Sequence, residues 1–250
     1  MKRTLFLPCF ILLLLFTAAG TATADEGSGP RIRVKDGTSS NWSGYAVETN
    51  LASPQSNAVS DVKGQWTVPT VTGTTNAYSS AWIGIDGYSD GTVEQIGTEQ
   101  DWSNGTPKYY AWFEMYPKFP VVIKNITVHP GDSISAEVKY NGNNFFVLSM
   151  TNLSSGQTYS TTRKARAQRQ SAEWIVEAPS SSGGVLPLAD FGTVTFTNAY
   201  ATLNGQTGSI SYSAWQKDAI TMVSKSGSVK ATPSGLSPDG TSFSVAWNGS

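Results

Sequence analysis

The sequence is poor in the residues that most often mark a chemical class. It has one cysteine, Cys9, and one histidine, His129, among 250 residues. A single cysteine excludes a disulfide framework within the chain, and these two residues are too few for a zinc site built from Cys and His. Charged residues make up only 14%, with 17 basic against 18 acidic. This balance excludes a charge-driven disordered chain and a basic nucleic-acid binder.

The single histidine has the context of a turn residue. His129 is followed by Pro130-Gly131-Asp132, a typical turn sequence. The chain has no nucleophile elbow to support a Ser-His-Asp triad and no Gly-rich phosphate loop. We therefore predict that an exported enzyme with this sequence uses carboxylates for its acid–base work.

Long apolar runs are confined to the start of the chain. Lys2 and Arg3 precede a short apolar stretch, and small residues then end in Ala22-Thr23-Ala24. This pattern predicts a secretory signal peptide over residues 1–24. Its removal takes Cys9 and two of the 17 basic residues but no acidic ones, so the remainder carries a net charge of −3. We expect a secreted monomer that has no thiol and does not associate with membranes after cleavage.

The remaining chain is predicted to be one all-β domain. Residues 25–40, rich in Gly and Ser, indicate a flexible lead-in or short pro-segment, and residues 41–250 form the domain. Apolar residues then recur with period two, as in Val62/Gly64/Trp66/Val68, Ile134/Ala136/Val138/Tyr140 and Phe243/Val245/Trp247. Pairs such as Asn104-Gly105, Asn204-Gly205 and Asp239-Gly240 predict tight turns between the strands. The pattern favours an antiparallel β-sandwich. Residues 163–176 are the one stretch with a weaker helical alternative.

Three predicted strands carry aromatic and acidic side chains on one face. Residues 79–87 place Trp82, Gly84 and Asp86 together; residues 108–117 place Tyr110, Trp112, Glu114 and Tyr116 together; residues 172–179 place Glu173, Ile175 and Glu177 together. A solvated sheet face would explain any one of these strands. The three together favour a groove for an extended ligand, either a peptide or a sugar.

Six blocks of sequence resemble the glutamic peptidases, or eqolisins, and occur in the order seen in that family. They are NWSGYAV (41–47), GQWTVP (64–69), AWIGIDG (81–87), EQIGTEQDW (94–102), YYAWFEMYP (109–117) and AEWIVE (172–177). The resemblance implies a secreted endopeptidase that acts on polypeptides at acidic pH and needs no metal or cofactor. It also implies a concanavalin-like sandwich of two large antiparallel sheets. The absence of cysteine after the signal fits a bacterial-type member.

The resemblance also implies a catalytic pair, Gln95 and Glu177. Glu177 would take a proton from the attacking water and return it to the leaving amine, while the amide of Gln95 would orient the water and stabilise the oxyanion. Gln65 and Glu173 are rivals by residue type; Gln65 lies in a block that is not catalytic in the family. The residues implied to line the substrate site are Trp82, Asp86, Asp101, Trp102, Trp112, Glu114 and Tyr116, with Asp86 and Glu114 bonded near the catalytic pair.

Two other functions are compatible with the composition. Eight tryptophans and ten tyrosines permit a non-catalytic secreted sandwich that binds carbohydrate. Paired carboxylates such as Glu114 and Glu177 permit a glycosidase if they flank a sugar site. A basic stretch of Arg163, Lys164, Arg166 and Arg169 is predicted to be a solvated hairpin loop, with a proteolytic processing site as the functional alternative.

Overall fold

The computed structural model describes residues 37–249, which form strands and connecting loops without a helix. No helix in this part of the chain is therefore long and apolar enough to cross a membrane. The predicted signal peptide and residues 25–36 of the predicted lead-in lie outside the described residues. Thr38 and Ser39, inside the predicted lead-in, already form a strand.

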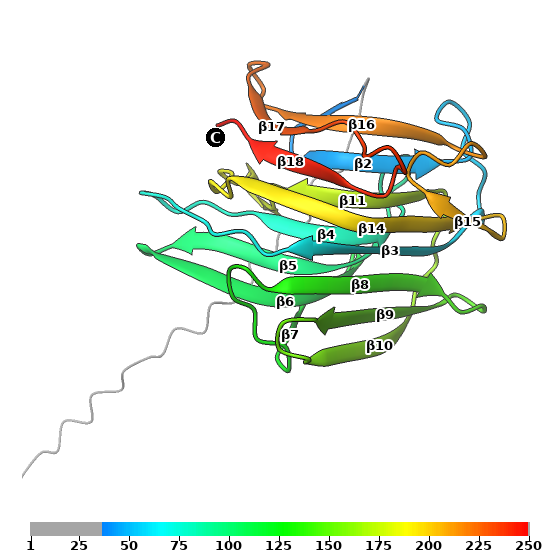
Figure 1. Ribbon diagram of the computed structural model, residues 1–250, viewed down its shortest axis with the longest axis horizontal. Coiled ribbons are helices and arrows are strands. Elements are labelled where there is room, and N and C mark those ends of the chain that lie inside the picture. Colours follow the sequence, from blue (N-terminus) through cyan, green and yellow to red (C-terminus); the bar gives the residue numbers. More distant parts are fainter. Residues whose placement is uncertain (1–36, 250) are drawn as a thin grey trace, which may run out of the picture.

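The strands fold into a sandwich of two antiparallel layers, as the sequence predicts (Figure 1). Their bounds are β1 Thr38–Ser39, β2 Trp42–Glu48, β3 Val59–Thr67, β4 Ser80–Ile85, β5 Val93–Ser103, β6 Thr106–Tyr116, β7 Val121–Ile123, β8 Ser133–Tyr140, β9 Phe145–Asn152, β10 Thr158–Lys164, β11 Ser171–Glu177, β12 Ser180–Ser181, β13 Gly184–Val185, β14 Thr193–Leu203, β15 Gln206–Ser209, β16 Gln216–Val223, β17 Val229–Pro233 and β18 Phe243–Trp247.

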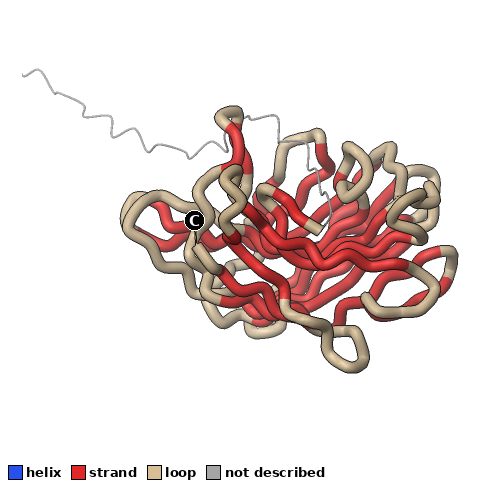
Figure 2. The backbone as a smooth tube through the Cα atoms, turned by 90° about the horizontal axis from the view of Figure 1, so that it is seen from above, coloured by secondary structure: helices blue, strands red, loops and turns tan. Residues whose placement is uncertain are grey.

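One continuous path of hydrogen-bonded strands builds both layers. The first layer has the order β10-β9-β8-β3-β14-β18-β17, and the second has the order β2-β11-β4-β5-β6-β7. β16 joins them because it pairs with β17 on one side and β2 on the other. Viewed from above, the strands run in curved layers with the loops gathered at their ends (Figure 2). β1 adds to β16 in parallel, β15 pairs with β14, and β12 and β13 form a separate small hairpin.

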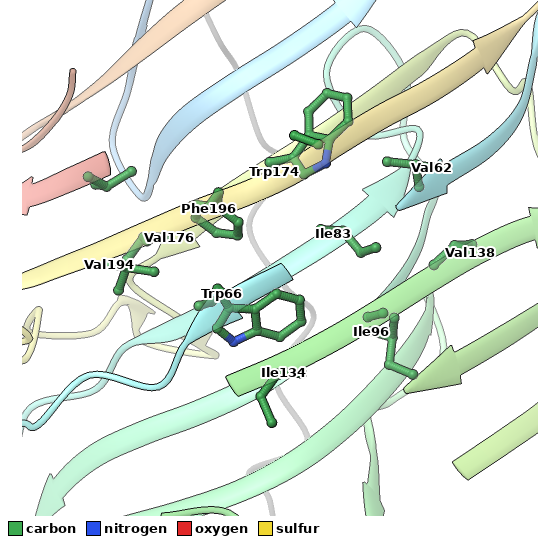
Figure 3. Packing of buried hydrophobic residues seen from close by; sticks show 14 of the residues in the cluster. Val62, Trp66, Ile83, Ile96, Ile134, Val138, Trp174, Val176, Val194 and Phe196 are labelled. Atoms are coloured by element: carbon green, nitrogen blue, oxygen red, sulfur yellow. The ribbon is translucent and has the colours of Figure 1, made fainter. Parts of the chain in front are cut away.

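The main hydrophobic core fills the space between the layers. Period-two alternation directs Val62 and Trp66 of β3 inward, toward Ile83 of β4 and Trp174 of β11 (Figure 3). Trp66 and Trp174 are at most 2% exposed, and each indole nitrogen donates a hydrogen bond, Trp66 to Thr98 Oγ1 and Trp174 to the carbonyl of residue 63. The inner face of the second layer thus contributes to this core, while its outer face carries a separate set of polar and aromatic residues.

The Asn-Gly turns take the conformation that the sequence predicts. Asn104 and Gly105 have φ values of 53° and 76°, and the flanking residues Ser103 and Thr106 are paired. Positive φ at both turn positions is what a two-residue hairpin with right-handed twist requires. This hairpin joins β5 to β6 and sets their register.

The basic stretch is not the hairpin loop that the sequence suggested. Arg163 and Lys164 end the edge strand β10, and residues 165–170 form an extended crossover from the first layer to β11 in the second. The guanidinium of Arg163 lies over the ring of Phe113 at 5.0 Å, and that of Arg169 lies over Tyr140 at 3.8 Å. The helical alternative for residues 163–176 is likewise wrong, because Ser171–Glu177 pairs on both sides within the second layer.

Candidate active site

The outer face of the second layer carries a second apolar cluster, separate from the main core. Its members come from β2, β4, β5, β6, β11 and β16: Trp42, Ala46, Trp82, Val93, Trp112, Ile175 and Ile220, with Tyr88, Tyr110 and Tyr116 packed against them. Strand alternation places Glu173, Glu177, Gln95 and Glu114 on this same face. The outer face therefore combines aromatic rings with carboxylates, as the sequence predicts for three strands.

Glu177 stands at the end of β11 and has a hydrogen-bond donor at each carboxylate oxygen. Oε1 accepts from Asn41 Nδ2 at 3.0 Å, and Oε2 accepts from Trp82 Nε1 at 2.9 Å. The side chain keeps partial exposure. Loss of hydration raises the pKa of Glu177 to about 8, and the charge of Glu114 adds to the rise, while the two donors oppose it.

Gln95 and Glu114 form the second hydrogen-bonded unit of the outer face. They are paired in register on β5 and β6, and Gln95 Nε2 donates to Glu114 Oε2 at 2.5 Å. Burial raises the pKa of Glu114 to about 7, and the bond from Gln95 opposes that rise. Gln95 is 5% exposed, and its Oε1 has no hydrogen-bond partner within residues 37–249. The amide thus has an acceptor available for a further hydrogen bond.

Trp82 lies between these two units, and two glycines make room for it. A Cβ on Gly97 would come within 2.5 Å of Trp82 Cβ, and a Cβ on Gly84 would lie 3.0 Å from Trp82 Cζ3 and 3.1 Å from Gln95 Cβ. The indole therefore reaches from the neighbourhood of Gln95 to Glu177, to which its nitrogen donates. Larger residues in place of these glycines would displace the ring.

Glu99 and Asp101 add a carboxyl pair that sequence reasoning missed in part. They are two residues apart on β5, so they share the outer face, and their carboxyl groups are hydrogen-bonded to each other. Burial, then the charge of Asp101, raises the pKa of Glu99 well above its usual range, and burial raises that of Asp101 to about 7. Asp101 was predicted, whereas Glu99 was not. Period-two spacing from Gln95, four residues earlier, would have found it.

Asp86 is buried where β4 ends and serves the backbone. Its two carboxylate oxygens accept the backbone amides of Arg169 at 2.6 Å and Gln170 at 2.7 Å. Burial, followed by the charge of Asp90, raises its pKa to about 8 in spite of these bonds. The carboxyl therefore fixes the crossover that leads into β11. It acts on the strand of Glu177 rather than directly on Gln95 or Glu177.

The remaining predicted substrate residues divide between two environments. Trp112 and Tyr116 belong to the outer face, and Trp112 Nε1 has no hydrogen-bond partner in the described chain. Trp102 follows Asp101 on the strand and so points to the opposite side, where its ring packs over Gly73. The structure does not bring Trp102 together with the other predicted residues.

The two rivals for the catalytic roles are separated by their surroundings. Gln65 lies on β3 in the first layer, where Oε1 accepts from Asn198 Nδ2 at 2.9 Å. Glu173 shares the outer face and is in register with Gln95 across Gly84. However, it is fully buried, and neither of its oxygens has a hydrogen-bond partner in residues 37–249. Burial raises its pKa well above the usual range and shields it from solvent, which favours its neutral form.

Outside this face, the structure offers little other chemistry. His129 lies in the predicted turn, where its backbone amide donates to Asp132 Oδ2 at 2.8 Å and its side chain is 69% exposed. Within the described part of the chain, no group of three or more His, Cys, Asp and Glu residues is arranged to hold a metal ion.

Comparison with known proteins identifies the family. Residues 40–247 match the Peptidase A4 family. This chain belongs to that family. The match extends the resemblance seen in six sequence blocks to nearly the whole described structure.

Two curated relatives and two solved structures support the assignment. Aspergillopepsin-2 of Aspergillus niger is 32% identical over 211 residues, which cover 72% of each chain, and scytalidopepsin B of Scytalidium lignicola is 31% identical over 154 residues, 57% of this chain and 58% of its own. Scytalido-glutamic peptidase, solved with a transition-state analogue inhibitor, matches with a TM-score of 0.69 at 27% identity over 84% of this chain and 98% of its own. Aspergilloglutamic peptidase from Aspergillus niger matches with a TM-score of 0.59 at 32% identity over 69% and 99%.

The family assignment confirms the predicted sandwich, the glutamic peptidase resemblance and hydrolysis of peptide bonds as the activity. It also removes the reason to prefer a carbohydrate-binding module or a glycosidase. Both curated relatives are fungal, so the prediction of a bacterial-type member has no support.

Proposed function

We propose that this protein is an exported endopeptidase in which Glu177 and Gln95 form the catalytic pair. The observation that carries the proposal is the contrast among the carboxylates of the outer face. Glu177 combines partial exposure with a donor at each oxygen, and Oε1 of Gln95 has no hydrogen-bond partner among residues 37–249. A general base needs access to water and a partner that stabilises its ionised form, and both conditions are met at Glu177.

Glu177 acts as base and then as acid. In its ionised form it accepts a proton from a water molecule as the water oxygen attacks the scissile carbonyl carbon. The carboxylic acid so formed returns the proton to the leaving amine when the C–N bond breaks. The hydrogen bonds from Asn41 and Trp82 keep the carboxylate in one orientation through both steps.

Gln95 supplies the neutral partner. Its Nε2 has two hydrogens, one of which is donated to Glu114, so the amide is oriented with Oε1 on the other side. Oε1 then accepts a hydrogen from the attacking water, and the second Nε2 hydrogen is available to the developing oxyanion. An amide suits this task because it both donates and accepts and does not titrate.

The proposed working range is acidic, and the protonation of Glu177 and Glu114 determines whether the site can work there. Burial, and to a smaller extent the charge of Glu114, raises the pKa of Glu177 to about 8, which favours its protonated form in acid. Glu114 itself is neutral below its pKa of about 7, which removes one of the causes that raise the pKa of Glu177. We propose that protonation of Glu114 lowers the pKa of Glu177, so that a larger ionised fraction of Glu177 can act as base in acid. A value of kcat/KM that rises steadily to pH 8, with no acidic maximum, would contradict this.

The substrate is a polypeptide, bound along the outer face against Trp82, Trp112 and Tyr116. Glu114 and Asp101 lie on the same face. Asp86 instead binds the backbone of the crossover, and Trp102 packs over Gly73 on the other side of the strand. We also propose that the protein is exported, because residues 1–24 have the pattern of a signal peptide, and that it is a monomer.

The decisive experiment compares the exported protein with its Glu177→Gln variant on a denatured protein substrate across pH 2–7. We expect the wild type to cut within the chain and the variant to lose cleavage while keeping its circular dichroism spectrum and melting temperature. Retained cleavage by the variant would refute the role of Glu177. Saccharide binding without any proteolysis would favour the carbohydrate-binding alternative.

A further inference from the structure

The segment before β2 reaches the same carboxylate that Trp82 holds. Asn41 Nδ2 donates to Glu177 Oε1 at 3.0 Å, and Ser39 Oγ donates to Asn41 Oδ1 at 3.2 Å. Ser39 and Asn41 are 3% and 2% exposed. These two buried polar side chains therefore form a continuous chain of hydrogen bonds that runs from Ser39 through Asn41 to Glu177.

The direction of each bond in this chain follows from the donors and acceptors available. The backbone amides of Asn41 and Trp42 both point at Ser39 Oγ, at 3.4 and 3.2 Å. They use the oxygen as an acceptor, so the hydroxyl hydrogen of Ser39 is left to donate to Asn41 Oδ1. With its oxygen turned to Ser39, the amide of Asn41 must present Nδ2 to Glu177. Ser39 thus determines which end of Asn41 the carboxylate meets.

The backbone holds this arrangement in place from both sides. Ser39 lies on β1 opposite Met222 of β16. The backbone carbonyl of Asn41 accepts a hydrogen bond from the backbone amide of Ala178, the residue after Glu177, at 2.8 Å. Trp42 and Glu177 are paired in register where β2 meets β11. The positions of the Asn41 amide and the Glu177 carboxylate are therefore fixed by main-chain pairing as well as by their own bond.

We propose that Ser39 and Asn41 are positioning residues for the Glu177 carboxylate, Asn41 by holding Oε1 and Ser39 by fixing the orientation of the Asn41 amide. The inference rests on the proposed function, because it acts through Glu177 as base. An amide donates at every pH, so Asn41 favours the ionised carboxylate throughout the working range. The other groups that face Glu177 are Trp42 from β2, Trp82 from β4, Glu99 from β5 and Glu114 from β6.

The test is the pH profile of kcat/KM for Asn41→Ala. A hydrogen bond to a charged group is typically strong enough that its loss lowers kcat/KM by about tenfold or more and moves the acidic limb upward by about one pH unit. We expect KM to change little, because Asn41 has no proposed contact with substrate. Ser39→Ala should produce a smaller shift in the same direction, and Ser39→Thr, which keeps the hydroxyl, should restore the wild-type profile.

Asn152→Ala is the matched control. Asn152 is also fully buried and also donates to a carboxylate, Asp132 Oδ2 at 2.8 Å, but it lies at the end of β9. Its loss should lower the melting temperature without moving the pH profile. An Asn41→Ala profile that coincides with the wild type, or a shift reproduced by Asn152→Ala, would overturn the inference.

Two further measurements keep the inference falsifiable. If Asn41→Ala does not fold, the Ser39→Ala and Ser39→Thr pair decides, since equal profiles for these two variants would contradict the role of Ser39. Titration of Glu177 by carbon-13 NMR should show a higher pKa in Ser39→Ala than in the wild type. An active Glu177→Gln enzyme would refute the proposed function itself, whereas an inactive one beside an unaltered Asn41→Ala profile would refute only the positioning role.

Discussion

The two glutamates of β11 lie four residues apart on the outer face and have different surroundings. Glu177 meets two donors and retains solvent access, whereas Glu173 is fully buried and has no hydrogen-bond partner in the described structure. Near Glu173 lie further buried carboxyls, Glu48 and Asp86, and the Tyr88 hydroxyl that donates to Asp218. Identical side chains four residues apart on one strand therefore differ in hydrogen bonding and solvent access, because the neighbouring strands supply different groups.

The largest expected difference is between the effects of Glu173→Gln and Glu177→Gln on kcat/KM. Since burial favours the neutral form of Glu173, a neutral amide of similar shape should leave kcat/KM within about tenfold of the wild type, whereas Glu177→Gln should lower it by about 10³-fold or more. Peptide cleavage assays on the two variants give the ratio. An inactive Glu173→Gln enzyme beside an active Glu177→Gln enzyme would exchange the two roles.

Gln95 offers a test of whether the amide stabilises the transition state. Gln95→Leu removes both the donor and the acceptor at similar volume, and loss of an oxyanion donor typically costs about 10²–10³ in kcat. We expect this loss with KM nearly unchanged. Gln65→Leu, in the first layer, is the control and should keep full activity. Equal effects of the two substitutions would remove Gln95 from the mechanism.

Three buried carboxyls in and beside the second layer should make the fold less stable as pH rises. The pKa is raised to about 7 at Glu48, about 8 at Asp86 and, on the inner face between Ile85 and Met115, about 9 at Glu94, in each case chiefly by burial. Folded pKa values above the unfolded values of about 4 mean that stability is fully present below pH 4 and is lost progressively between pH 4 and 9.

Urea unfolding at pH 4 and pH 8 measures this dependence. We expect the free energy of unfolding to fall by several kcal/mol, roughly a 10 °C drop in melting temperature for a chain of this size. Glu94→Leu should flatten the dependence, because it removes a buried acid whose pKa is raised to about 9. A protein that is more stable at pH 8 than at pH 4 would show that the carboxyls are not desolvated as described.

Local patterns in the sequence were sufficient for much of the fold. Alternation predicted β3, β8 and β18, and the Asn-Gly pair at 104–105 predicted the hairpin between β5 and β6. Both depend on neighbouring residues alone, through strand periodicity and the backbone freedom of Gly and Asn. The interpretation of the basic stretch as a hairpin loop was wrong because the stretch connects β10 in the first layer to β11 in the second. Which strands become neighbours in these layers depends on residues far apart in the sequence.

The sequence by itself determined the family, the strand faces and the identity of the carboxylates and amides that reach the outer face. Only the tertiary structure decided that Asn41 and Trp82 hold Glu177, that Asp86 binds the crossover backbone, and that Glu99 joins Asp101. The physical reason is that hydrogen bonding and loss of hydration depend on which strands become neighbours. Asn41 and Glu177 are 136 residues apart along the chain, and pairing of β2 with β11 brings them to 3.0 Å.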